Sequence, residues 1–217
     1  MTTIAIPRVY SRSRAAVDSD IYISGEIRGP EHYIEEFQTL REANEGDEIK
    51  IFLNTPGGRV DTAVQYLSGI RNTKATVTCV IEGLCQSAGT YIFLAADQWI
   101  VNQDSLMMIH NYSGGAYGKG KELLENAKAN DKWISGMMDT VYKGFLTVEE
   151  IEKVNSNQDI WLTTEEINDR LEDVIEVRTL MIKEHEELMR VKLDKQLQEY
   201  NKNATENSKD IQECPSE

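Results

Sequence analysis

A serine in a run of small residues is the first group in this sequence that could carry out chemistry. The stretch GLCQSAGT (83–90) places Ser87 after one apolar run and before another. If Ser87 begins a helix, its hydroxyl lies where the helix dipole and free N–H groups stabilise negative charge. The small neighbours Ala88 and Gly89 leave room for a substrate. The pattern favours a nucleophile at Ser87, with a packing residue or a helix N-cap as the alternative. Cys85 occupies the first glycine position of GxSxG, so the α/β-hydrolase elbow motif is absent.

A glycine-rich turn, NTPGG (54–58), lies upstream of the serine. Pro56 fixes one backbone torsion, and Gly57 and Gly58 free the next two and leave their N–H groups uncovered by side chains. Between a strand and a helix, such a turn can direct an N–H group toward developing negative charge. The turn therefore indicates an anion-stabilising donor, or else an ordinary connection.

A histidine supplies a third candidate group, in the stretch MMIHNYSGGAYG (107–118). His110 follows an apolar strand and precedes a glycine-rich segment, which suits a general base. A hydrogen-bonded structural histidine is the alternative. His32 and His185 lie among acidic residues on expected helix surfaces, and we expect both to be solvated.

The hydrophobic pattern predicts the elements that must position these groups. Strands are expected where apolar and β-branched residues alternate or cluster between turn residues, at 20–25, 48–54, 75–83, 98–102 and 105–110. Helices are expected where apolar residues recur at helical spacing, at 30–44, 60–72, 87–96, 119–145 and 176–200. Thr147 with Glu150, and Thr163 with Glu166, form capping boxes at two further helix starts. The chain after Asn201 is polar, and we expect it to be disordered.

Alternating strands and helices in the first half indicate βαβ units and a sheet of largely parallel character. The expected fold class is α/β with an α-rich extension. We divide the chain into an N-terminal segment (1–19), a core domain (20–176) and a C-terminal helix with a polar tail (177–217). A length of 217 residues suits this arrangement, or at most two small domains.

Composition excludes several classes of protein. The net charge of −14 argues against binding to nucleic acid or to an anionic membrane. Cys79, Cys85 and Cys214 show no CxxC and no His/Cys cluster, so we expect no zinc site, disulfide framework or cofactor. The N-terminal residues lack the order of a signal peptide, and no apolar run approaches the roughly 20 residues of a membrane span. We therefore expect a cytoplasmic protein.

In their order and spacing, the three stretches resemble the motifs of the Clp protease proteolytic subunit family, which are self-compartmentalised serine peptidases. NTPGG is similar to the family's NSPGG, GLCQSAGT to its GxAASMGA, and MIHNYSGGAYG to its MIHQPxGGAxG. The separation between the second glycine of the turn and the serine is also that of the family. Weaker similarities at VYSR (9–12), IYISGEI (21–27) and QDIWLTTEEI (158–167) extend the resemblance over residues 9–176.

The resemblance implies a serine endopeptidase with a Ser-His-Asp triad. Ser87 would be the nucleophile, His110 its general base, and Asp159 the group that orients the imidazole. The N–H groups of Gly58 and Ala88 would form the oxyanion hole. An extended peptide would pair with a strand edge that contains Ser113, Gly114, Gly115 and Ala116.

The resemblance also implies the fold and the partners of the family. The fold is the ClpP/crotonase-like arrangement of repeated β-β-α units, with a long handle helix at 119–145. The substrates are unfolded or scaffold polypeptides, the assembly is a homo-oligomeric ring, and an AAA+ unfoldase is the expected partner. Eight residues precede VYSR, whereas the family has a longer segment that forms axial pore loops, so docking of an unfoldase stays open. The shortened docking elements are similar to those of phage-encoded members.

The sequence departs from the family around Asp159. The family has arginines on both sides of its catalytic aspartate, and one of them forms an ion pair between rings. Here the neighbours are Gln158 and Ile160, so that ion pair cannot form in the same way.

Two other functions stay open. A signal-peptide-peptidase-like hydrolase of the same superfamily pairs its serine with a lysine, and SAGTYIFLAADQWIVN (87–102) is similar to that group. The second alternative function is that of a catalytically silent subunit that only assembles with others or binds a partner. A crotonase-type acyl-CoA enzyme ranks last, because the Ser/His pair has no task there.

Overall fold

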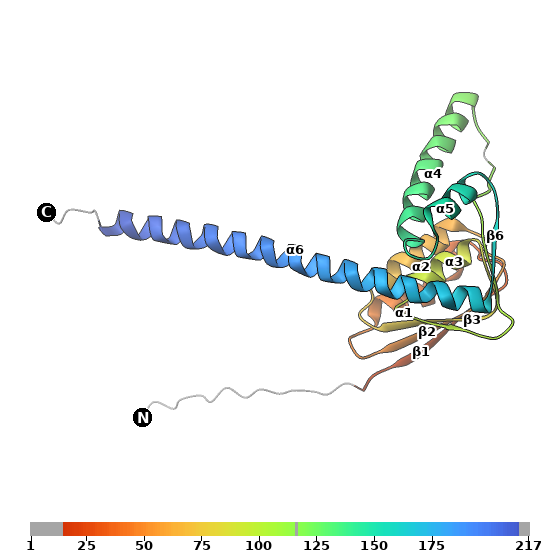
Figure 1. Cartoon of the computed structure of the whole chain (residues 1–217), viewed down its shortest axis with the longest axis horizontal. Helices are drawn as coiled ribbons and strands as arrows, with labels where there is room; N and C mark the ends of the chain where they lie inside the picture. Colours follow the sequence, from red (N-terminus) through yellow and green to blue (C-terminus); the bar gives the residue numbers. More distant parts are fainter. Residues whose placement is uncertain (1–14, 116, 213–217) are drawn as a thin grey trace.

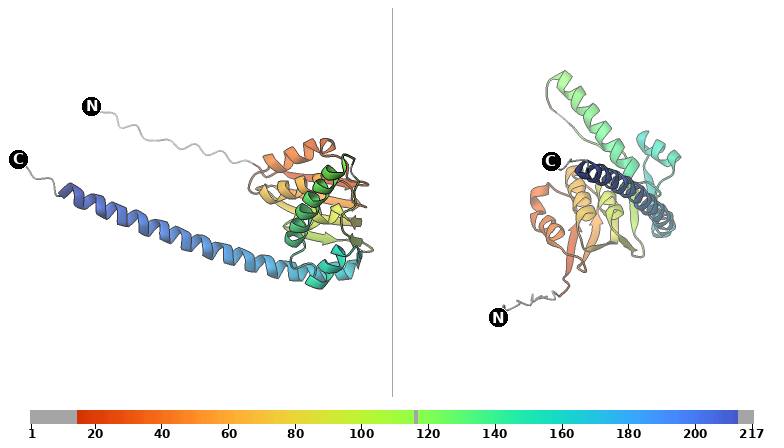
Figure 2. Two further views of the ribbon diagram at one scale, coloured as in Figure 1. Left: turned by 90° about the horizontal axis from the view of Figure 1, so that it is seen from above. Right: turned by 90° about the vertical axis from the view of Figure 1, so that its left-hand side faces the viewer.

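A computed structural model describes the backbone of residues 15–115 and 117–212. A mixed sheet carries three short helices on one side, and two long helices, α4 and α6, extend away from it (Figures 1 and 2). Ala116, Cys214 and the VYSR stretch at 9–12 lie outside the described residues.

The sheet is parallel except at one edge. Its strands are β1 (Asp18–Ser24), β2 (Glu48–Thr55), β3 (Thr76–Gln86), β4 (Gln98–Val101), β5 (Leu106–Ile109) and β6 (Ile160–Thr163). The order is β1-β2-β3-β5-β6, with β4 paired to the first half of β3 and β5 paired to its second half. Only the β5–β6 pair is antiparallel among the described strands. The expected α/β fold with a largely parallel sheet is therefore confirmed.

Alternating burial along the strands shows that one face of the sheet forms the core. In β2, Ile49, Ile51 and Leu53 are buried and the residues between them are half-buried or exposed. The buried face packs against α1 (Ile34–Glu42), which follows a short 3-10 turn at Pro30–His32, and against α2 (Val60–Asn72) and α3 (Ala88–Ala95). All eight residues of α3 are buried, as its uniformly small and apolar sequence predicts.

Helix α4 (Gly120–Val141) packs through its C-terminal half, where Ile134, Met138 and Val141 are buried. Its N-terminal half projects from the domain (Figure 1). The helix ends before the expected residue 145 because Gly144 adopts a positive φ of 82°, which terminates helical geometry. Helix α5 (Val148–Asn155) follows and begins at the expected capping box of Thr147 and Glu150.

The C-terminal region is one helix, α6 (Thr164–Gln212), and not a shorter helix followed by a disordered tail. The expected disorder after Asn201 is wrong for residues 201–212, and residues 213–217 lie outside the described residues. The stretch from 164 to 212 contains neither glycine nor proline, so nothing in it terminates a helix. The helix crosses the proposed domain boundary at residue 176 and extends far beyond the sheet (Figures 1 and 2).

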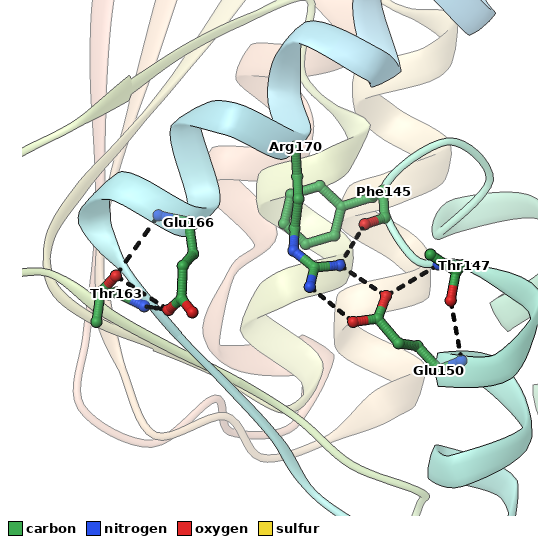
Figure 3. A network of polar contacts seen from close by, with 6 residues as sticks. All are labelled: Phe145, Thr147, Glu150, Thr163, Glu166 and Arg170. Carbon is green, nitrogen blue, oxygen red and sulfur yellow. Dashed lines mark hydrogen bonds and ion pairs between the residues drawn. The ribbon is translucent and has the colours of Figure 1, made fainter.

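Two arginines attach α6 to the rest of the domain. The Arg178 guanidinium donates to the carbonyl oxygens of Leu94 and Ala96, at the C-terminal end of α3, and lies 4.7 Å from the centroid of the Trp99 ring. The Arg170 guanidinium forms two 2.7 Å hydrogen bonds with the Glu150 carboxylate and donates to the Phe145 carbonyl at 3.0 Å (Figure 3).

Replacing Arg178 with methionine should destabilise the domain. The substitution Arg178→Met leaves the terminal carbonyl groups of α3 without their donor and should lower the free energy of unfolding by about 2 kcal/mol. Arg190→Met is the matched control, because Arg190 is exposed on the projecting part of α6. Urea unfolding measures both variants, and equal losses would contradict the anchoring role of Arg178.

The Arg170–Glu150 pair should make stability depend on pH. Hydrogen bonds from Arg170 lower the pKa of Glu150 from 4.5 to about 2. Because this pKa is lower in the folded state, the ion pair stabilises fully above about pH 5 and is lost as the pH falls toward 2. In Glu150→Gln, the loss of stability between pH 5 and pH 3 should be smaller than in the wild type. Glu152→Gln, an exposed change on the same helix, should keep the wild-type dependence. Urea unfolding at each pH tests this, and identical slopes for Glu150→Gln and wild type would refute it.

Candidate active site

Ser87 forms the corner between β3 and α3 and has an unusual backbone conformation. Its φ is 52° and its ψ is −125°, a combination that costs a non-glycine residue of order 1–3 kcal/mol. The corner is held by a hydrogen bond from the Ser87 N–H to the Met108 carbonyl at 2.8 Å and by one from the Thr90 N–H to the Ser87 carbonyl at 3.0 Å. Such a turn aims the hydroxyl out of the sheet, as a reactive serine requires.

His110 reaches the serine from the neighbouring strand. It directly follows β5, which runs parallel to the end of β3 at Leu84–Gln86. The two residues therefore leave the same edge of the sheet, where parallel α/β sheets carry their sites. The His110 Nε2 atom lies 2.7 Å from the Ser87 Oγ atom. A hydroxyl hydrogen-bonded to an imidazole is the arrangement of an activated nucleophile.

The NTPGG turn lies against the serine. A side chain on Gly57 would come within 2.6 Å of the Ser87 Cβ atom and 3.2 Å of the Ala88 nitrogen. Gly58 is fixed by hydrogen bonds on either side of it, from the Ile27 N–H to the Gly57 carbonyl and from the Arg59 N–H to the Ile27 carbonyl, each 2.8 Å. Within the described ranges, neither the Gly58 nor the Ala88 N–H has a hydrogen-bond acceptor. The two segments that meet at Ser87 thus each contain an N–H group that is free to donate a hydrogen bond.

Asp159 lies across from His110 but does not contact it. The antiparallel register pairs Ile109 with Ile160, so the next backbone positions are His110 and Asp159. The Asp159 side chain is exposed, and among the described residues no hydrogen bond or ion pair joins it to His110. A 3.2 Å hydrogen bond from the Asn111 Nδ2 atom to the Asn157 Oδ1 atom joins the two segments just beyond these positions. The backbone of Asp159 thus lies opposite that of His110, but the two side chains form no hydrogen bond in this conformation.

The expected substrate segment lines a cleft. Ser113, Gly114 and Gly115 are exposed and have no regular structure, and Ala116 is not described. The three residues border a cavity of about 390 Å³ that is closed on other sides by the start of α2 and by one face of α4. The cavity also contains Tyr112, two residues after His110, and Arg59, which follows Gly58. The cavity therefore lies beside residues that neighbour Gly58 and His110 in the sequence.

Other reactive side chains lie outside this site. His32 and His185 are exposed, as expected. Cys79 and Cys85 are free and buried, and burial raises the pKa of both thiols. The described part of the chain contains no group of three metal-ligating side chains. None of its helices is both long and apolar enough to cross a membrane.

Two further residues lie at the serine corner, Thr90 and Tyr142, and neither was predicted from the sequence. The Thr90 Oγ1 atom lies 2.6 Å from the Ser87 carbonyl oxygen and 2.6 Å from the Tyr142 hydroxyl. A threonine one turn after the serine is visible in the sequence, but Tyr142 is far away along the chain and carries no local signal.

Comparison with known proteins assigns the family. Residues 8–176 match the family model described as Clp protease. The chain belongs to the Clp protease family. The fold agrees: a solved structure of a ClpP1 mutant from Listeria monocytogenes superposes with a TM-score of 0.56 at 26% identity, over 70% of this chain and 86% of that one.

Curated relatives have a similar identity and are matched over part of their length. The ATP-dependent Clp protease proteolytic subunit of Deinococcus radiodurans is 27% identical over 129 residues, which cover 58% of this chain and 63% of the relative. Proteolytic subunit 3 of Rhizobium meliloti is 27% identical over 124 residues, with coverages of 55% and 63%. The match thus spans just under two thirds of these relatives.

The contact between the turn and the serine gives a direct test of the site. Gly57→Ala inserts a methyl group against the Ser87 Cβ atom and should slow covalent labelling of Ser87 by a fluorophosphonate by at least ~10²-fold. Gly136→Ala is the matched control, because a Cβ atom there meets nothing within 4 Å. Labelling at the wild-type rate in a folded Gly57→Ala variant would show that the turn does not define the site.

Proposed function

We propose that this chain is a serine-type endopeptidase, the proteolytic subunit of a self-compartmentalised protease. The observation that carries the proposal is the 2.7 Å contact between the Ser87 Oγ and His110 Nε2 atoms. Because the chain belongs to the Clp protease family, we expect the same chemistry.

The Ser87 hydroxyl, the His110 imidazole and the two free N–H groups suffice for acyl transfer. The Ser87 oxygen attacks the carbonyl carbon of the peptide bond, and its proton passes to the His110 Nε2 atom. The carbonyl oxygen becomes an oxyanion, which the N–H groups of Gly58 and Ala88 stabilise. Protonated His110 then gives the proton to the departing amine, and an acyl-enzyme remains. A water molecule then attacks the acyl carbon while His110 accepts its proton, and His110 returns that proton to the Ser87 oxygen as the ester bond breaks and the acid product leaves.

Asp159 completes the proposed triad by accepting a hydrogen bond from the His110 Nδ1–H group. Because the Asp159 backbone lies opposite His110, this contact requires a change in the conformation of the Asp159 side chain and no change of strand register. The carboxylate would fix the imidazole tautomer and stabilise its positive charge in the transition state.

The proposed substrate is an unfolded or scaffold polypeptide in extended form. The cavity beside Tyr112 has exposed, side-chain-free backbone at Gly114 and Gly115, which suits main-chain pairing with a peptide of varied sequence. The net charge of −14 disfavours binding to nucleic acid, and the reaction needs no cofactor.

We further propose a homo-oligomeric ring. Exposed Leu124 lies in the projecting half of α4 and exposed Trp133 in its other half, and a neighbouring subunit would cover both. Gln158 and Ile160 provide no cation beside Asp159, so stacking of rings would have to use contacts other than the family's ion pair. An AAA+ unfoldase is the partner expected of such a chamber, and the protein would act in the cytoplasm.

A Ser-Lys hydrolase is the second candidate. It would use a lysine as base and leave His110 without a role, so the Ser87–His110 contact favours the histidine mechanism. A silent assembly subunit would keep the fold and show no hydrolysis.

Substitutions of the proposed triad separate these functions. Ser87→Ala and His110→Ala should each lower the kcat of peptide hydrolysis by roughly 10⁴-fold or more, and Asp159→Asn by about 10²–10⁴-fold. His185→Ala, an exposed histidine on α6, should keep wild-type activity. A fluorogenic peptide and a denatured protein substrate provide the assay.

The outcomes are distinct. Full activity in His110→Ala would favour a Ser-Lys site, and an inert wild type would favour the silent subunit. Light scattering on the same preparations distinguishes loss of chemistry in an intact ring from loss of the ring.

A further inference from the structure

The carbonyl group of Ser87 is held by two donors from one residue. The Thr90 N–H donates to the Ser87 oxygen at 3.0 Å, and the Thr90 hydroxyl donates to the same oxygen at 2.6 Å. A threonine hydroxyl that returns to an earlier carbonyl of its own helix is common, so this contact alone indicates no special role.

The Thr90 hydroxyl has a second partner, which comes from a distant element. The Tyr142 hydroxyl, at the C-terminal cap of α4, lies 2.6 Å from the Thr90 Oγ1 atom. The single hydroxyl proton of Thr90 is directed to the Ser87 carbonyl, so we assign the Tyr142 phenol as the donor to Thr90; a hydrogen bond also joins the Tyr142 and Tyr91 side chains. Burial raises the pKa of the Tyr142 phenol well above its ordinary value, so the phenol keeps the proton it donates.

The direction of this chain matters because of the geometry of the peptide bond. The Ser87 carbonyl and the Ala88 N–H belong to one planar trans peptide group, in which the C=O and N–H bonds point in opposite directions. Fixing the Ser87 oxygen toward Thr90 therefore turns the Ala88 N–H away from the helix interior. Hydrogen bonds to the carbonyl also polarise the peptide group and strengthen its N–H as a donor.

We infer that Thr90 and Tyr142 are positioning residues that orient the Ala88 N–H for the oxyanion. This inference rests on the proposed function and goes beyond it. Thr90 and Tyr142 touch neither substrate nor reacting atoms, and they act through the Ser87–Ala88 peptide group. The arrangement also ties the end of the long helix α4 to the corner that carries the nucleophile.

The inference predicts a loss of kcat without a change in KM. Thr90→Val keeps the shape of the side chain and removes the hydroxyl, and it should lower kcat by about 10–100-fold, less than complete removal of an oxyanion donor. Thr90→Ser restores the hydroxyl and should return kcat to within about threefold of wild type. Tyr142→Phe leaves the Thr90 bond intact and should lower kcat by about 3–10-fold.

A matched control separates positioning from stability. Ser105 is buried, and its hydroxyl donates to the Ile81 carbonyl at 3.3 Å, away from Ser87. Ser105→Ala should lower the thermal midpoint as Thr90→Val does and leave kcat unchanged. The affinity of a peptide boronate, which forms a tetrahedral adduct with the serine, should fall in Thr90→Val in parallel with kcat.

Two results would overturn the inference. One is a Thr90→Val variant with lowered thermal stability and wild-type kcat and boronate affinity. The other is a crystal structure of that variant in which the Ser87–Ala88 peptide group keeps its orientation. The structural result is independent of activity, so a wild type without hydrolytic activity would refute the proposed function while the orientation of the peptide group still tests this inference.

Discussion

The left-handed backbone of Ser87 is the constraint on which the site depends. A serine with φ of 52° at the end of a strand is unfavourable by itself, and it persists because its surroundings leave no alternative. The neighbouring strand accepts its N–H at the Met108 carbonyl, and the turn at Gly57 packs so closely against the corner that a Cβ atom on Gly57 would come within 2.6 Å of the Ser87 Cβ atom. This conformation brings the hydroxyl to His110 and leaves the Ala88 N–H without an acceptor.

Helix α3 transmits that constraint to the rest of the fold. It is buried along its whole length, so it cannot shift without disturbing the core. Distant elements contact both of its ends: Tyr142, at the C-terminal cap of α4, hydrogen-bonds Thr90 in the first turn of α3, and Arg178 of α6 donates to the C-terminal carbonyl groups. Both long helices that project from the domain thus contact α3, the helix that begins after Ser87.

Local signals predicted much of this molecule, and long-range contacts account for the remainder. The helix at 60–72 and both capping boxes could be read from neighbouring residues. The Ser87–His110 contact was predicted from the order of three motifs. Strand β6 was missed because four residues carry little periodicity and are stabilised by pairing with β5. The exposed conformation of Asp159 and the Thr90–Tyr142 bond depend on packing between segments far apart in the chain, which no local pattern encodes.

A crystal structure of the phosphonate adduct tests the central claim most directly. The account predicts phosphorus bonded to the Ser87 Oγ atom, with one phosphoryl oxygen about 3 Å from the nitrogen atoms of both Gly58 and Ala88 and with His110 beside the serine oxygen. An adduct on another residue, or a phosphoryl oxygen turned to solvent with both amides unengaged, would contradict it.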